Sequence, residues 1–233
     1  MTEEHMLRTE LLNESEKLAE CLLSDDQVDT LLQSAEEIAA GIENLDLDVD
    51  FSSFWQLDAS IGGIGGYCLL SSMKPFRNPF LHGMARELFR SIQYAAAQIL
   101  YHNGPNTART IVEFAGMHLE AVTKFWANRT SSVLDANHYK RLPLGNSLYT
   151  LKKRGLVADG LAESLDAFLT LYNLAKHETT HDDRDRTFSV PDALVNYLSS
   201  RILSRRILKP YYDEILHGIP DYEKSFPGIN MNP

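Results

Sequence analysis

Apolar residues recur at helical spacing along most of the chain, starting near its N-terminus. Two stripes there are separated by Ser24-Asp25-Asp26, and Ser24 is a suitable N-cap for the second of them. The first stripe comprises Leu7, Leu11, Leu12, Leu18 and Leu22, and the second comprises Val28, Leu31, Leu32, Ala35, Ile38 and Ile42. This pattern predicts an N-terminal helical hairpin.

The same periodicity predicts further helices, which begin and end at proline, glycine or capping residues. They are expected over about 79–102, 105–128, 146–154 and 159–177, with Gly155 closing the third. A last helix begins at the capping-box-like Ser189-Val-Pro-Asp192 and ends near Leu216. Segment 46–58 is expected to be irregular, with Phe51, Phe54 and Trp55 docked on the core. Few stretches alternate at period two, so the fold class is all-α, a helical bundle with little or no sheet.

Length and charge divide the chain into three parts. A chain of 233 residues can bury one sizeable core, and 44% hydrophobic with 23% charged residues is ordinary for a globular protein. Residues 1–50 hold 15 acids and two bases, whereas the rest of the chain has a balance of +3, for a net charge of −10. We therefore expect an acidic helical arm over 1–50, a helical bundle over 51–217 and a loosely packed tail over 218–233.

This charge distribution limits the classes of partner. An acidic protein is not expected to bind nucleic acids broadly, but the mildly basic body leaves room for a local basic site. The acidic arm is either a solvated helical face or a surface that screens such a site.

Cysteine usage and hydropathy indicate a cytoplasmic protein without membrane contact. The two cysteines, Cys21 and Cys68, form no CxxC pair, which fits a reducing compartment. Residues 1–10 lack the apolar segment of a secretory signal. The longest apolar run, residues 59–70, is shorter than the roughly 20 residues that span a bilayer.

A formal HExxH motif, His177-Glu-Thr-Thr-His181, favours one kind of chemistry. On a helix the two histidines share a face and can bind one Zn²⁺, while Glu178 acts as general base. Asp182 and Asp183 follow directly, and the third ligand would have to be Glu214 or Glu223 without a supporting motif. A zinc-dependent hydrolase using His177 and His181 is therefore the lesser alternative, and no metal is expected.

A wider pattern surrounds the same residues. Residues 142–178 combine a short helix carrying Leu-Lys-Lys, a Gly-Leu-Val connector and a long helix that ends in Asn-x-x-x-His. This combination resembles the core of a HEPN domain, a helical family found in toxins, antiphage systems and RNA-processing proteins. Members often carry Arg-Asn-x-x-x-His at that helix end. Asn173 and His177 match it, and Tyr172 stands where the Arg would be. The resemblance extends over about 79–216.

The resemblance implies a homodimer that binds RNA or a nucleotide in a toxin or defence context. In active members Arg and His of two subunits face each other and cut RNA without metal or other cofactor. On that pattern His177 is the acid–base residue, Asn173 a positioning residue and Tyr172 a weak substitute for the Arg. Because a phenol cannot neutralise charge on a phosphate, the ribonuclease is expected to be altered or lost.

Each candidate residue also has a structural interpretation. His177 could be a histidine at a helix C-terminus, Asn173 a core polar residue, Tyr172 ordinary packing and His118 a core histidine. A basic patch on the last helix, with Lys176 nearby, could contact phosphate, or it could be a solvated face that pairs with the acidic arm. The patch comprises Arg201, Arg205 and Arg206, with Lys209 beside them.

The Tyr at the Arg position also supports a second functional hypothesis. On this alternative the bundle is a non-catalytic protein-interaction module, and the acidic hairpin covers a basic surface of a partner. It predicts that removal of residues 1–50 abolishes binding and leaves the remaining bundle folded.

Overall fold

The structure, a computed structural model of the chain, describes residues 11–44, 51–61, 79–101, 107–130, 142–176 and 188–216. These segments form eight helices and no strand, which confirms the expected all-α class. The helices are α1 (Asn13–Leu22), α2 (Asp25–Asn44), α3 (Ser52–Ile61), α5 (Pro79–Tyr101), α6 (Thr107–Arg129), α8 (Leu144–Lys153), α9 (Asp159–Lys176) and α10 (Val190–Leu216). None of them is long and apolar enough to cross a membrane.

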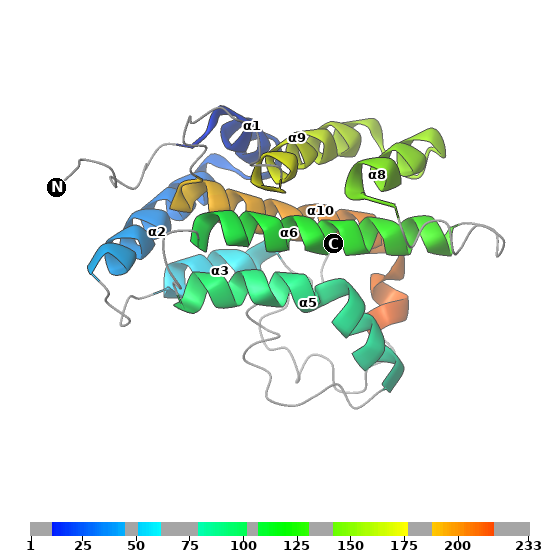
Figure 1. Cartoon of the computed structure of the whole chain (residues 1–233), viewed down its shortest axis with the longest axis horizontal. Helices are drawn as coiled ribbons and strands as arrows, with labels where there is room; N and C mark the ends of the chain where they lie inside the picture. Colours follow the sequence, from blue (N-terminus) through cyan, green and yellow to red (C-terminus); the bar gives the residue numbers. More distant parts are fainter. Residues whose placement is uncertain are drawn as a thin grey trace.

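Helix α10 is the central element of the bundle (Figure 1). It packs against α1, α2, α3, α5, α6 and α9, and every residue from 188 to 201 is buried. Helix α6 runs beside it and packs in turn against α5, α8 and α9. The interior therefore lies along α10 and is closed by α6 on one side and by the N-terminal helices on another.

The two predicted N-terminal helices form, and the second begins just after Ser24. The prediction that they pack on each other as a hairpin was wrong, because α1 lies against α9 and α10, whereas α2 lies against α10 and α3. The Ser24 N–H donates to Gln27 Oε1 at 3.0 Å, one half of a capping box. Leu18 and Leu31 are fully buried within the same hydrophobic core as α10. The apolar stripes of α1 and α2 are thus part of the core of the bundle, and only their other faces are solvated.

The ends of two later helices also follow the predicted local chemistry. Ser189 Oγ and the Ser189 N–H donate to Asp192 Oδ2 at 2.5 and 2.9 Å, and the other carboxylate oxygen accepts the Leu12 N–H at 2.8 Å. Asp192 therefore caps α10 and ties it to the start of α1. Gly155 closes α8 with a φ of +64°, and the Leu156 N–H bonds back to the Leu151 carbonyl at 3.0 Å.

The prediction for segment 46–58 was partly wrong, because residues from Ser52 onward form α3. Phe54, Leu57 and Ile61 are buried at helical spacing, which the short, serine-rich start of the segment obscured. The predicted docking of its aromatic residues is confirmed. The Phe54 ring is fully buried, 4.9 Å from the Trp55 centroid and 5.8 Å from that of Tyr197 on α10.

Candidate functional site

Tyr172, which was predicted as a weak substitute for an arginine, lies in the contact between α9 and α6. The residue is 4% exposed, and its ring rests on the backbone of α6 at Gly116. A Cβ atom at Gly116 would lie 2.0 Å from Tyr172 Cδ2, so only glycine accommodates the ring. Tyr172 is therefore a packing residue within one subunit, which confirms the structural interpretation of this position.

The Tyr172 hydroxyl is a neutral hydrogen-bond donor. Burial raises its pKa to about 12, and the nearby Glu120 carboxylate, which accepts its hydrogen bond, and Glu113 act in the same direction. The phenol therefore cannot supply a charge, of either sign, at neutral pH.

The two carboxylates beside Tyr172 each hold a cation of their own helix. Lys124 Nζ lies 2.5 Å from Glu120 Oε1, and Arg109 Nε lies 3.2 Å from Glu113 Oε1. Arg109 Nε also donates to the Ala175 carbonyl of α9 at 2.9 Å. Both cations neutralise acids of α6, and Arg109 also joins α6 to α9.

Lys176 and Asn173 are predicted site residues of α9 that face solvent. Both are exposed on α9, and Lys176 Nζ lies 5.4 Å from the centroid of the Tyr172 ring. The exposure of Asn173 shows that its interpretation as a core polar residue was wrong. His177, Glu178 and His181 lie outside the described residues, and so does the side chain of Glu214, so the roles predicted for them stay predictions.

The predicted basic patch on α10 is divided between the interior and the surface. Arg201 is 4% exposed, and its Nη1 donates to the carboxylate and the backbone carbonyl of Asp58 on α3. Burial raises the pKa of Asp58, whereas the charge of Arg201 and hydrogen bonds from Arg201 and Tyr197 act in the opposite direction. The proposal that Arg201 grips phosphate was wrong, because a buried guanidinium held by Asp58 is not accessible to a ligand.

The other members of the patch differ in exposure. Arg205 is half-buried and donates from Nη1 to the Ile61 carbonyl at the end of α3, at 2.6 Å. Arg206 and Lys209 are exposed. The structure thus places two of the arginines against α3 and leaves Arg206 and Lys209 on the surface.

His118 is a core histidine, as predicted. It is 1% exposed and its Nδ1–H donates to the Leu88 carbonyl on α5 at 2.5 Å. Burial lowers its pKa to about 4, so the ring is neutral at physiological pH. It is a link between α6 and α5.

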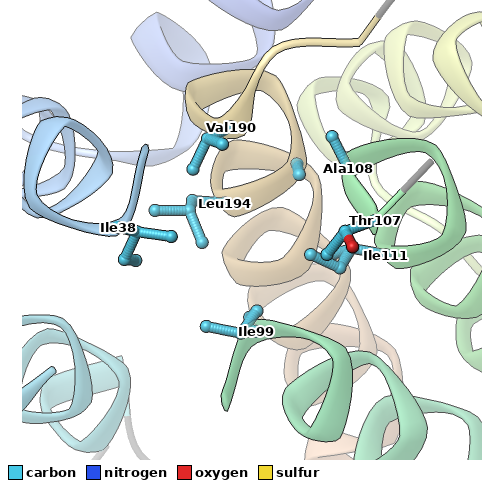
Figure 2. Close-up of a pocket in the computed structure, with 8 residues that line it drawn as sticks. Ile38, Ile99, Thr107, Ala108, Ile111, Val190 and Leu194 are labelled. Carbon is cyan, nitrogen blue, oxygen red and sulfur yellow. The ribbon is translucent and has the colours of Figure 1, made fainter. Parts of the chain in front are cut away.

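A small cavity lies where α2, α5, α6 and α10 meet (Figure 2). Figure 2 shows Ile38, Ile99, Ile111 and Leu194 around it, with the Thr107 hydroxyl as a polar atom. A catalytic pocket needs several convergent polar groups, and this cavity lacks them. Among the described residues no group of three His, Cys, Asp or Glu side chains could hold a metal ion.

No family model, curated protein or solved structure matches this chain. The site must therefore be judged on its own geometry. The sequence reasoning overlooked Gly116, Glu120 and Asp58, although an isolated glycine in the middle of a helical pattern is a known signal of close packing. The pairing of Asp58 with Arg201 left no comparable signal, because the two residues belong to helices far apart in the sequence.

Proposed function

We propose that this protein is a non-catalytic interaction module built on a HEPN-like helical bundle. The observation that carries the proposal is the position of Tyr172 in the contact between α9 and α6. Metal-free RNA cleavage of the HEPN kind needs a fixed positive charge at that position. Here the side chain is neutral, packed on Gly116 and bonded to Glu120 within its own subunit.

The engagement of neighbouring cations supports the same proposal. Arg109 and Lys124 pair with carboxylates of α6, and Arg201 pairs with Asp58. Each of these side chains would have to leave a partner before it could bind a phosphate. Arg109 and Arg201 connect neighbouring helices, which is what a scaffold needs.

RNA or nucleotide binding, in a homodimer, is the second candidate function. Lys176 and Asn173 favour it, because they are exposed within one helical turn of each other and lie beside His177 in the sequence. One ammonium and one amide can hold a phosphate weakly. We expect any such binding to weaken sharply with salt and to be lost in Lys176→Ala.

The first experiment compares RNA cleavage by the wild-type protein and His177→Ala, with single-stranded and hairpin RNA as substrates. We expect no cleavage that depends on His177. If the wild-type protein cleaves RNA and His177→Ala does not, the proposal is overturned and the ribonuclease hypothesis is supported. Lys153→Ala, a change of an exposed lysine on α8, is the control for general effects of charge.

Two further measurements address the alternatives. Metal analysis of protein purified without chelator tests the zinc hydrolase. One equivalent of zinc in the wild-type protein, and none in His181→Ala, would support that alternative. Light scattering at several concentrations tests the homodimer. A monomer at every concentration would exclude an active site shared between two subunits.

A further inference from the structure

A surface groove runs between α1 and α2, the two helices at one side of the bundle (Figure 1). Its floor is apolar and consists of Leu11, Ala19, Leu23, Val28 and Leu32. Ala19 and Leu23 are buried, whereas the other three retain partial exposure to solvent. The floor is therefore continuous with the core but is not fully covered by the chain.

The rim of the groove is acidic on both sides. Glu16 and Glu20 lie one turn apart on α1, and Asp25 and Asp29 lie one turn apart on α2. All four side chains are exposed. Two rows of carboxylates thus flank one apolar strip.

These carboxylates have no cation to neutralise them within the segments that the structure describes. The one basic residue of α1 and α2, Lys17, pairs with Glu14 at 2.8 Å. Two arginines of α10, Arg201 and Arg205, are held by α3. Residues 11–44 hold nine acids and one base, and this excess concentrates negative potential on this side of the molecule.

We propose that this groove docks a basic amphipathic helix of a partner protein, with the apolar stripe of that helix on the floor and lysines or arginines of both its flanks on the two acidic rows. The inference rests on the proposed interaction function and names the class of partner. It follows from complementarity, because apolar helix faces bind apolar grooves and flanking charges select the partner.

The same charges argue against other occupants. Carboxylate rows repel the phosphates of nucleic acids and the anionic surface of a membrane. The terminal segments of this chain are also acidic, with three acids and one base in residues 1–10 and two acids and one base in residues 218–233. A basic helix from another protein therefore fits the groove better than these segments do.

The test uses a fluorescein-labelled helical peptide of about 18 residues, or five turns, with leucines on one face and lysines on both flanks. Fluorescence anisotropy measures its binding to the full chain. Neutralising the rim with Glu16→Gln, Glu20→Gln, Asp25→Asn and Asp29→Asn should weaken binding about tenfold or more. Circular dichroism verifies that the variant keeps its helical content.

A matched control removes four exposed acids outside the groove, through Glu36→Gln, Glu37→Gln, Glu163→Gln and Asp166→Asn. It should weaken binding less than about threefold, because distant exposed charges are screened by salt. A peptide of the same composition, scrambled so that it has no apolar face, should bind poorly.

Equal losses in the two quadruple variants, or equal binding of the scrambled peptide, would overturn the proposal in favour of general charge attraction. Failure of the wild-type protein to bind the amphipathic peptide would also overturn it. The proposed function is tested separately, since it fails if RNA cleavage depends on His177 or if the protein holds zinc that is lost in His181→Ala.

Discussion

The ring of Tyr172 on α9 packs directly on Gly116 of α6, and this contact requires both residues. A glycine in mid-helix costs about 1 kcal/mol relative to alanine by intrinsic propensity. Here it admits an aromatic ring whose atoms occupy the position that a Cβ would take. The ring in turn directs its hydroxyl to Glu120. Tyr172, predicted as a weak substitute for a catalytic arginine, is thus a packing residue.

Replacement of this glycine tests the contact. We expect Gly116→Ala to destabilise the protein by about 1–3 kcal/mol, because overpacking exceeds the gain in helix propensity. Urea unfolding measures the change. Gly160→Ala is the matched control, since a Cβ at Gly160 meets nothing within 4 Å, and it should be neutral or slightly stabilising. Similar effects of both substitutions would contradict the close contact.

His118 makes stability depend on acid pH. Burial lowers its pKa to about 4, from 6.5, so between these values a proton binds the unfolded chain and not the folded one. The free energy of unfolding is unaffected by this ring above about pH 6.5. It decreases between about pH 6.5 and 4, with a slope near 1.4 kcal/mol per pH unit.

The variant His118→Asn isolates this contribution. Asparagine keeps a donor near the position of Nδ1 and does not titrate. The free energy of unfolding of the variant should therefore decrease less than that of the wild type between pH 7 and pH 5. Chemical unfolding at each pH measures both proteins. Asp58, whose raised pKa acts in the opposite direction, is present in both and cancels in the difference. Parallel pH curves would show that His118 is not the group responsible.

At the scale of elements, α3 is fastened to α10 by buried polar contacts as well as by aromatic rings. Arg201 reaches the Asp58 carboxylate, and Arg205 reaches the Ile61 carbonyl that ends α3. A buried ion pair contributes little net stability but is costly to break, because one partner is left as an unpaired charge. This pair therefore determines the position of α3 on α10 and adds little to the free energy of unfolding.

The consequence can be measured with single and double variants. Asp58→Leu and Arg201→Met alone should each cost about 3–5 kcal/mol, whereas the double variant should recover most of that loss. Arg206→Met, on the exposed face of the same helix, should change stability by less than about 0.5 kcal/mol. Additive losses in the double variant would mean that the two side chains do not act as a pair.

At the scale of the molecule, the N-terminal arm formed by α1 and α2 contributes to two surfaces at once. Its inner face belongs to the core through residues such as Leu18, Leu31 and Ile38. Its outer face carries the acidic rows of the groove. Binding and folding are therefore combined in one element, and the two roles can be separated by charge substitutions better than by truncation.

Truncation gives a direct test of this organisation. Removal of residues 1–44 would expose the faces of α9 and α10 that α1 and α2 cover, so we expect loss of cooperative thermal unfolding and increased binding of a hydrophobic dye. The rim-neutralised quadruple variant should unfold cooperatively. A truncated protein that melts as sharply as the full chain would instead support the division near residue 50 that the sequence predicted.

The sequence alone determined the helices other than α3 and the chemistry of several helix ends, because periodicity, Ser24, Gly155 and the Ser189–Asp192 box act over a few residues. It also located His118 in the core. Only the tertiary structure decided which polar residues are hidden. Arg201 lies 143 positions from Asp58, and Tyr172 lies on a glycine of another helix. Local patterns show that a residue is charged or aromatic, but burial depends on a partner that folding brings from elsewhere in the chain.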